Sequence, residues 1–474
     1  MAQWGNIPSG MNLRQSNNFK DGLNTEVSPF FVSENTMIEG YGWDFEQYPA
    51  IKVRNGRSNY GSSGGAITRL LMNYGNTHLV RAVGTSLQYN SSGTTWTSIS
   101  GTFANTDWDA ANFDINGPVL ILTNGTDTPR YWNGSTLSTI SAMPKGKYVA
   151  ADNLRVYTAG VAGSEDVISY CAFQNALDWT TASNAGKVQF YTANGGPVVG
   201  LHAYAGQIWA FKKDAYCIIF HTGDARATHR LVQGSTSIGC ASNKTIKEVG
   251  ELLFWLGETN VYVGAGGEAQ IVGRPIKKYL DNINQSAIGN SFAFTENLRY
   301  YLCIPTGTNT QPDTCLVYDI KFRQWLPYSI SLGGLRFGAS LNNTAYCGDL
   351  NGQTFKMNDG LTDAGAAVPW LVRSRPFDDG MKEAEKELWE LHLQGNFPSG
   401  STLNVQIAPD DIGSTWFNID YDPISTSEAT QNKNLIVPLD TVPLCNFYTY
   451  KISGTGPVAI QEIQRYARIQ PVQY

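Results

Sequence analysis

Seven segments of the sequence follow one plan: an apolar strand, a turn containing Gly, Asn, Asp or Glu, and a second apolar strand. They span residues 70–84, 111–125, 147–160, 201–214, 245–259, 291–305 and 337–352. Their turns fall near Gly75, Gly117, Asn153, Gly206, Gly250, Asn297 and Asn343, with a period of about 45 residues that is typical of four-stranded propeller blades. The repeat therefore predicts an all-β chain with a β-propeller of about seven blades over residues 66–375.

The segments on either side of the repeat predict two further parts. Residues 1–65 are expected to form an N-terminal arm and a strand that closes the propeller ring, because such a strand removes a sheet edge. We expect that strand within residues 24–55, whereas 57–65 (RSNYGSSGG) is typical of a Gly/Ser linker. Residues 376–474 predict a small C-terminal β-sandwich or jelly-roll-like domain, because STLNVQIAP and FYTYKIS alternate with period two.

Charge and cysteine content limit the classes of function. The net charge is −6 with no block of like charges, which disfavours a surface that grips DNA or an anionic membrane but suits a conduit along which DNA slides. The scattered cysteines form no CxxC pair and predict reduced, buried thiols of a protein made in a cytoplasm. They are Cys171, Cys217, Cys240, Cys303, Cys315, Cys347 and Cys445. Without a secretory-signal pattern or an apolar run of about 18 residues, we expect a soluble protein with no Sec-type export and no membrane contact.

Several motifs that resemble functional sites are better explained as turns. Residues 411–416 (DIGSTW) match most of the Asp-box of sialidases, and 93–96 (GTTW) match its end, with Ser91 in place of the Asp. In sialidases the box stabilises a hairpin and is not the catalytic site, so here it predicts hairpins. Residues 264–267 (GAGG) resemble a phosphate-binding loop, but strand-like segments lie on both sides and no helix follows, which indicates a hairpin turn.

Two further features have alternative interpretations. The loops 124–127 (NGTD) and 359–363 (DGLTD) suit either a bound cation or Asx-turns, of which Asx-turns are the more frequent. Tryptophans end several repeats, in TTWTSIS, RYWNGSTLSTIS, ALDWTTASNAG and FRQWLPYS. Because aromatic residues dominate core burial, these tryptophans predict packing between blades rather than a ligand shelf.

The spacing of ionisable residues does not favour catalysis. Carboxylates show no paired spacing of the kind that a glycosidase needs, and Arg155, Arg226, Arg299 and Arg336 lie in different repeats. The histidines show no HxH or HExxH spacing. They are His78, His202, His221, His229 and His392. We therefore expect no catalytic, cofactor-binding or metal-binding residue, no cofactor and no enzymatic activity.

The order of phrases in residues 195–358 resembles the β-propeller tail hub or nozzle proteins of short-tailed bacteriophages, also known as packaged-DNA stabilisation proteins. The phrases are residues 195–224 and 235–280, followed by LRYYLCIP, CLVYDIKFRQWLPYS and YCGDLNGQTFKMND. The earlier GLNTEVSPFFV is similar to the start of many phage propeller proteins. The resemblance covers the middle third of the chain and this opening.

This resemblance implies a structural virion protein of the phage tail, synthesised in the host cytoplasm. Its partners would be further copies of itself in a homohexameric ring, the portal and adaptor proteins, and a tail spike, needle or fibre. The ring would continue the DNA channel, retain the packaged genome before DNA ejection, and let DNA pass without sequence-specific binding. No catalytic residue follows from the resemblance.

Two other functions compete with this one. The first is a carbohydrate-binding or glycan-cleaving propeller at a receptor-binding tip, which predicts a rim pocket with convergent carboxylates or exposed Trp and Tyr. The second is a cellular interaction scaffold of the WD-repeat kind. The repeats lack the GH…WD signature, which disfavours the scaffold.

Overall fold

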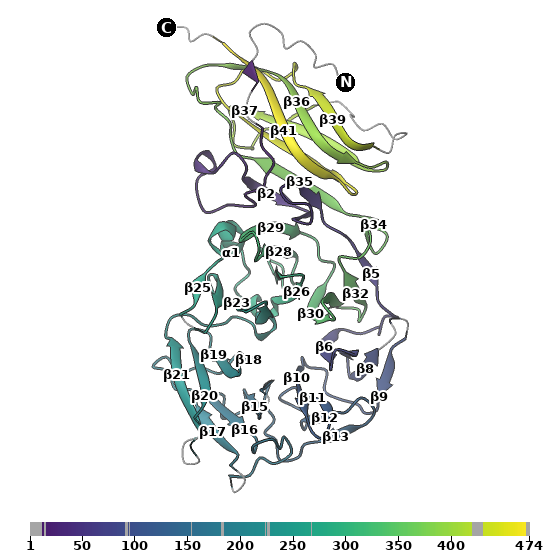
Figure 1. Cartoon of the computed structure of the whole chain (residues 1–474), viewed down its shortest axis with the longest axis vertical. Helices are drawn as coiled ribbons and strands as arrows, with labels where there is room; N and C mark the ends of the chain where they lie inside the picture. Colours follow the sequence, from purple (N-terminus) through teal and green to yellow (C-terminus); the bar gives the residue numbers. More distant parts are fainter. Residues whose placement is uncertain are drawn as a thin grey trace.

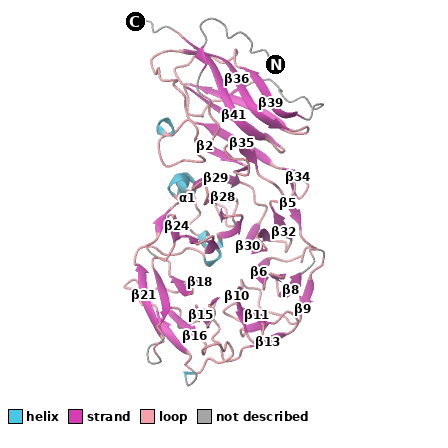
Figure 2. Ribbon diagram, viewed as in Figure 1, coloured by secondary structure: helices cyan, strands magenta, loops and turns pink. Residues whose placement is uncertain are grey.

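The computed structural model describes residues 12–470 apart from 14–15, 91–92, 94, 153, 182–183, 223, 225–227, 267 and 420–429. These residues form an all-β structure, as the repeat predicts (Figure 2). Helix α1 covers Lys277–Asp281, and among the 3-10 turns are η1 (Pro29–Phe31), η3 (Asn243–Thr245), η4 (Arg274–Ile276) and η5 (Ile288–Asn290). The described chain contains no helix long and apolar enough to cross a membrane. A ring of sheets forms one end of the molecule and a two-sheet part forms the other (Figure 1).

Six sheets of the ring each consist of four consecutive antiparallel strands. The first three are β6–β9 (Thr68–Tyr74, His78–Val83, Ser86–Asn90, Thr97–Ile99), β10–β13 (Asp109–Asp114, Pro118–Thr123, Arg130–Trp132, Leu137–Thr139) and β14–β17 (Tyr148–Ala151, Val156–Ala159, Val167–Tyr170, Gly186–Gln189). The next three are β18–β21 (Gly200–Tyr204, Gln207–Phe211, Tyr216–His221, His229–Ser235), β22–β25 (Lys247–Val249, Leu252–Leu256, Val261–Gly264, Gln270–Ile271) and β26–β29 (Phe292–Glu296, Arg299–Ile304, Thr314–Asp319, Gln324–Ser329).

The first two strands of every ring sheet form the hairpin that its sequence segment predicts. Gly75, Gly206 and Gly250 occupy their turns at positive φ, as do Asn297 and Asn343. Glycine adopts this conformation without a steric penalty and asparagine tolerates it, so these residues favour the tight connections. The expected turn residue Asn153 lies outside the described residues.

The first strands of the sheets lie innermost around the centre of the ring (Figure 1), and most neighbouring pairs of them are in contact. Cavities lie in the space between them, which we call the central channel. Strand β30 (Leu335–Leu341) of the seventh sheet contacts both β26 and β6, so the ring is closed. Packing between neighbouring sheets uses the expected tryptophans. Trp132 is fully buried and lies 4.8 Å from Tyr74 and 4.9 Å from Tyr89 of the preceding sheet, measured between ring centroids. The arrangement is propeller-like.

The seventh sheet includes a strand from the N-terminal segment. Its order is β30, β31 (Thr344–Asp349), β32 (Thr354–Met357), β5 (Arg57–Asn59), β33 (Thr362–Asp363) and β34 (Ala366–Ala367). An N-terminal strand therefore joins the ring, but it lies in the segment expected to be a linker and not within residues 24–55. Large side chains hold it there: Arg57 lies over the Phe355 ring at 4.6 Å, and Tyr60 packs against Trp96 and Tyr346.

The second part of the molecule consists of two sheets built from both ends of the chain. One has the order β3 (Trp43–Asp44), β4 (Ile51–Val53), β41 (Ala459–Ile469), β36 (Lys386–Phe397) and β39 (Thr430–Pro438), and β1 (Asn12–Leu13) also pairs with β41. The other has the order β2 (Met37–Tyr41), β35 (Pro369–Ser374), β40 (Tyr448–Thr455), β37 (Thr402–Pro409) and β38 (Phe417–Asn418). Side chains of both sheets belong to one hydrophobic core.

These pairings correct the expected domain boundaries of 1–65, 66–375 and 376–474. Strand β35 pairs with β2 and β40, so the C-terminal contribution to the two-sheet part begins at Pro369 and not after Arg375. Strands β1 to β4 complete this part, although residues 1–25 are expected to be a flexible arm. Phe19 and Leu23 explain the difference, because both are buried in the shared core despite the polar composition around them.

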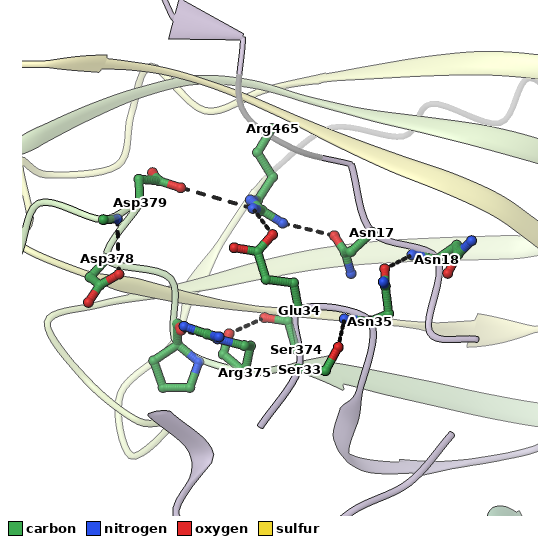
Figure 3. A network of polar contacts seen from close by, with 12 residues as sticks. Asn17, Asn18, Ser33, Glu34, Asn35, Ser374, Arg375, Asp378, Asp379 and Arg465 are labelled. Atoms are coloured by element: carbon green, nitrogen blue, oxygen red, sulfur yellow. Dashed lines mark hydrogen bonds and ion pairs between the residues drawn. The ribbon is translucent and has the colours of Figure 1, made fainter. Parts of the chain in front are cut away.

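A buried arginine links the N-terminal segment to the C-terminal strands (Figure 3). Arg465 of β41 donates a hydrogen bond to Asn17 Oδ1 at 2.9 Å and lies 3.4 Å from a Glu34 carboxylate oxygen. Its guanidinium also stacks over the Phe377 ring at 3.5 Å and lies 4.0 Å from Asp379. The charge of Arg465 is therefore balanced by acidic groups from both ends of the chain.

The N-terminal segment also joins the two-sheet part to the ring. The Leu23 amide donates to the Trp325 carbonyl at 2.8 Å, and the Gly42 amide donates to the Tyr328 carbonyl at 3.2 Å, both in the outer strand β29. A buried ion pair of 2.6 Å connects Asp44 of β3 to Arg299 of β27. One continuous core therefore extends from the two-sheet part into the sheets β22–β25 and β26–β29.

Candidate functional site

Polar side chains gather at the rim of the ring where the innermost strands begin. Two cavities of about 320 and 400 Å³ lie there and share the lining residues Trp108, Asp109, Asn243, Lys244 and Phe337. We call this region the channel mouth. It is lined by residues in or next to the first strands of most of the ring sheets.

Asp107 is the centre of an ion-pair cluster at the channel mouth. Its carboxylate lies 2.9 Å from Arg336, 3.1 Å from Arg69 and 3.5 Å from Lys244. Burial lowers the pKa of the Lys244 ammonium to about 8, although Asp107 opposes this shift. The Lys244 ammonium also lies over the Phe337 ring at 4.9 Å. One carboxylate thus holds three cations from three sheets or their connections.

Asp109 forms a second link across the channel. One of its oxygens accepts hydrogen bonds from the Val149 amide at 2.9 Å and from Asn243 Nδ2 at 3.1 Å, and the other accepts from the Ala110 amide. Asn243 Oδ1 in turn accepts from the Leu201 amide at 3.2 Å. Burial raises the pKa of Asp109 to about 6, and its hydrogen bonds oppose that shift. The second and fifth ring sheets are therefore joined through side chains at the centre.

Two basic side chains lie deeper in the cavity. Lys247 Nζ donates a long hydrogen bond of 3.4 Å to the Gly338 carbonyl. His202 projects from β18 into the lining of the same cavity. Burial lowers the pKa of Lys247, and burial together with the charge of Lys247 lowers the pKa of His202 to about 4. At neutral pH His202 is therefore an uncharged imidazole beside an ammonium group.

The chemistry of the channel mouth is that of a polar binding pocket. It offers ammonium groups, an imidazole and amides, whereas both carboxylates are already engaged by several donors. Among the described residues, no group of three or more His, Cys, Asp or Glu side chains is placed to hold a metal ion.

The structure places the sequence candidates at separate positions. Arg336 lies at the channel mouth, Arg299 lies at the junction with Asp44, and Arg155 donates to the carbonyls of Cys171 and Asn184. Arg226 lies outside the described residues. Each described arginine has its own local partners, and the structure does not bring them to one site.

The expected turns are confirmed where the structure describes them. Asp411 accepts hydrogen bonds from the amides of Gly413, Ser414 and Thr415, which is the hairpin-stabilising role expected of the Asp-box. Asn124 Oδ1 accepts from the amides of Thr126 and Asp127, which is an Asx-turn. Ser91, Thr94 and Gly267 of the other motifs lie outside the described residues.

In the loop 359–363, protein side chains engage both carboxylates. Asp363 pairs with Arg54 through two hydrogen bonds of 3.0 and 2.5 Å. Asp359 accepts from Ser58 at 2.5 Å and from Lys356 at 2.9 Å. The seven cysteines are buried free thiols, as expected.

Two histidines meet in the outer half of the fourth sheet. His221 and His229 are cross-strand partners, and the Tyr157 hydroxyl lies 2.9 and 3.0 Å from their Nε2 atoms. Asp152 lies 3.1 Å from His221 Nε2. Burial lowers the pKa of His229 to about 3, so the His229 imidazole is uncharged near physiological pH.

A groove of about 580 Å³ follows the junction between the ring and the two-sheet part. Tyr41 and Tyr279 line it together with Glu39, Asp281 and Asn282. Glu39 lies 3.0 Å from Arg373 and 3.6 Å from Lys278.

Arg336 and His202 were named from the sequence, but the channel mouth and the residues that join it together were not identified from it. Asp109 and Asn243 are 134 residues apart, and neither belongs to a recognised motif. The available signal was weak: charged residues in DWDA and NKTIK stand just before or at the start of a first strand, where a propeller strand is otherwise apolar.

No family model and no curated protein matches the chain. Among solved structures, it is similar to the extracellular domain of the two-component system protein BT4673 from B. thetaiotaomicron, with 9% identity, coverage of 64% of this chain and 39% of that chain, and a TM-score of 0.42. It is also similar to the WD40 β-propeller domain of Doa1, with 8% identity, coverage of 64% and 96%, and a TM-score of 0.43. PorZ from Porphyromonas gingivalis gives 12% identity, coverage of 77% and 46%, and a TM-score of 0.38. The chain thus spans less than half of BT4673 and of PorZ, and similarities this weak carry no inference about function.

Proposed function

We propose that this chain is a structural subunit of a phage tail, a hub or nozzle protein that assembles into a ring below the portal and adaptor. In this proposal the seven sheets are the blades of a seven-bladed β-propeller. The two-sheet part is a C-terminal β-sandwich completed by N-terminal strands. The subunit would help to retain packaged DNA and would anchor spikes or fibres.

The observation that carries the proposal is the rigid connection between the two parts. A shared core, the Asp44–Arg299 ion pair and backbone hydrogen bonds to β29 fix the two-sheet part against the ring. A rigid two-part subunit presents separate surfaces in a fixed geometry, which is what a closed ring of subunits with further partners requires.

The channel mouth indicates that DNA would not pass through the centre of a single propeller. The Asp109–Asn243 hydrogen bond and the Asp107 cluster cross the centre of the ring, and the cavities there measure about 320 and 400 Å³. A DNA duplex, whose major groove alone is about 12 Å wide, does not fit through such a space. The DNA channel of the proposed assembly therefore lies between subunits and not inside one propeller.

An exposed apolar depression of about 360 Å³ in the two-sheet part is our candidate for subunit contact. It is lined by Phe30, Phe31 and Phe447 with the polar residues Asp378, Lys382 and Asn446. Phe31 is 81% exposed, which is unusual for so large an apolar side chain. Burial of the Phe31 side chain against a second copy of the chain would stabilise the ring of subunits by about 1.5–3 kcal/mol per contact.

Mass photometry and electron microscopy of the purified protein, alone and with its adaptor, test the proposal. We expect ring-shaped oligomers, and we expect Phe31→Ser to shift the population toward monomers. Tyr191→Ser is the matched control, because Tyr191 is 76% exposed but follows β17 in the ring of sheets, outside the apolar depression. A wild-type protein that stays monomeric both alone and with the adaptor would contradict the proposal.

The junction groove favours carbohydrate binding as a second candidate function. Tyr41 and Tyr279 with Glu39 and Asp281 form the combination of aromatic and acidic side chains that such a site needs. Glycan-array binding by wild type and its loss in Tyr41→Ala would favour this function. An array without any bound glycan would exclude it.

A further inference from the structure

The channel mouth carries more positive than negative charge. Arg69, Lys244 and Arg336 share the single carboxylate of Asp107, and Lys247 lies beyond them in the cavity. Asp109 is the other carboxylate there, and its oxygens already accept hydrogen bonds from two backbone amides and Asn243. The protein as a whole has a net charge of −6, so this cationic excess is local.

Lys247 and His202 are the groups whose hydrogen-bonding capacity is least used. Lys247 Nζ has three donor positions, and its contact in the described part of the chain is the Gly338 carbonyl at 3.4 Å. None of the ion pairs found among the described residues includes Lys247, although the charge of Asp109 opposes the lowering of its pKa. His202 likewise has no hydrogen-bond partner among those residues, and both side chains line the 320 Å³ cavity. A poorly compensated ammonium in a confined site is costly unless an anion accompanies it.

We propose that the channel mouth binds a small oxyanion, either free phosphate or a small polycarboxylate, through the ammonium groups of Lys247 and Lys244 and the imidazole of His202. The cavity volume of about 320 Å³ matches a small molecule. An ammonium group supplies strong charge-assisted hydrogen bonds to phosphate or carboxylate oxygens. The bound anion would balance the cations and join innermost strands from separate sheets of the ring.

The occupant is a small anion and not a DNA backbone, because the cavity lies at the centre of the ring and measures only about 320 Å³. The carboxylates of Asp107 and Asp109 would repel a bound oxyanion. The charge that attracts this anion therefore depends on the groups that already surround the two carboxylates. Three cations surround Asp107, and Asp109 accepts three hydrogen bonds while its charge also acts on Lys247. Four cations thus lie beside two carboxylates, and this excess is the charge that remains for a ligand.

Isothermal titration calorimetry and thermal unfolding of the full chain test this site. Sodium phosphate and sodium citrate are the two probes, and sodium chloride at matched ionic strength controls for screening. We expect one of the oxyanions to give a saturable heat and a rise in Tm that chloride does not reproduce. The two arms distinguish phosphate from a polycarboxylate.

Variants locate the binding. Lys247→Met is expected to weaken the oxyanion at least tenfold, whereas Lys187→Met, an exposed lysine of β17, leaves the affinity unchanged. His202→Gln keeps a donor of similar size and provides a second test if Lys247→Met fails to fold, with an expected weakening of about threefold. Absence of saturable binding by either anion would overturn the proposal, as would wild-type affinity in both Lys247→Met and His202→Gln.

Discussion

The ring and the two-sheet part of this molecule contain similar strands but are assembled in opposite ways. In the ring, six sheets use four consecutive strands each, so every ladder joins neighbouring segments. In the two-sheet part, β41 pairs with β1, β4 and β36, and β2 pairs with β35. The first architecture depends on local turns, whereas the second depends on both ends of the chain meeting.

This difference indicates which part of the molecule depends most on non-local contacts for its stability. Local hairpins form with a small loop-closure cost, while contacts between chain ends have a larger one. The N-terminal strands that complete the two-sheet part also contact β29 of the ring. We therefore expect damage in the two-sheet part to reach further through the molecule than equal damage within one ring sheet.

The largest expected effect is that of Trp43→Ala. Trp43 is fully buried, its ring centroid lies 5.3 Å from that of Trp370, and its Nε1 donates to the Leu371 carbonyl at 2.6 Å. Its loss is expected to lower the free energy of unfolding by about 3–5 kcal/mol. Hydrogen exchange should rise in both β2 and β41, from opposite ends of the chain.

Trp132→Ala is the matched variant within the ring, because Trp132 is also fully buried. Denaturant unfolding should show a loss of similar size, about 3–5 kcal/mol. Its increase in hydrogen exchange should stay within β10–β13 and the adjoining sheet β6–β9. If the increase in hydrogen exchange were equally confined in Trp43→Ala and Trp132→Ala, the expected difference between the two-sheet part and the ring would be contradicted.

Arg465→Met removes the cation that joins the chain ends in Figure 3. Asp379, which is buried, and Asn17 would lose their common partner. Because the buried Asp379 carboxylate would lose its neighbouring cation while it keeps the hydrogen bond from the Tyr448 hydroxyl, we expect a loss of about 3 kcal/mol. Arg468→Met on the same strand is the control, since Arg468 is exposed and its removal should cost less than about 0.5 kcal/mol. Equal melting temperatures for the two variants would show that the buried network contributes little.

Ser58→Pro tests the one ring sheet that is not local. Strand β5 lies between β32 and β33, so proline removes a backbone donor inside the sheet and is expected to cost about 2 kcal/mol. Ser58→Ala keeps the backbone and loses the hydrogen bond to Asp359, at about 1 kcal/mol. If thermal denaturation gave the same loss for both, strand β5 would not contribute to closure of the ring.

The smallest expected effect concerns the pH dependence of His202. Its pKa is lowered by burial from 6.5 to about 4 in the folded protein, so between these values the unfolded chain binds more protons. Stability is thus complete above pH 6.5 and declines as the pH falls toward 4. The partial exposure of His202 reduces the expected decline to about 1–2 kcal/mol.

Measuring the free energy of unfolding of wild type and His202→Asn across this pH range isolates the contribution of His202. Asp109 changes in the opposite direction, because its pKa is raised to about 6 and its protonation favours the folded state. Lys244, with a pKa of about 8, keeps its charge throughout this range. His78→Asn at the β6–β7 hairpin is the control. Parallel stability curves for wild type and His202→Asn would contradict the expected role of burial.

The fold could be predicted furthest where the signal was local. The turn residues Gly75, Gly206 and Asn343 mark hairpins that the structure confirms. The closing strand was misplaced, because Arg57 and Tyr60 stand in a Gly/Ser-rich stretch and their partners Phe355 and Trp96 are distant in sequence. The channel mouth could not be predicted, since its residues belong to no recognised motif until strands from most of the ring sheets come together there.

The sequence by itself determined the strands, their hairpins and the period of the ring, because alternating burial and turn chemistry act over a few residues. The tertiary structure alone decided which sheet receives β5, that β1 to β4 complete the two-sheet part, and that Asp109 meets Asn243 across the channel. These outcomes depend on the free energy of burying distant side chains such as Trp43 and Trp370 together, and no local pattern records that energy.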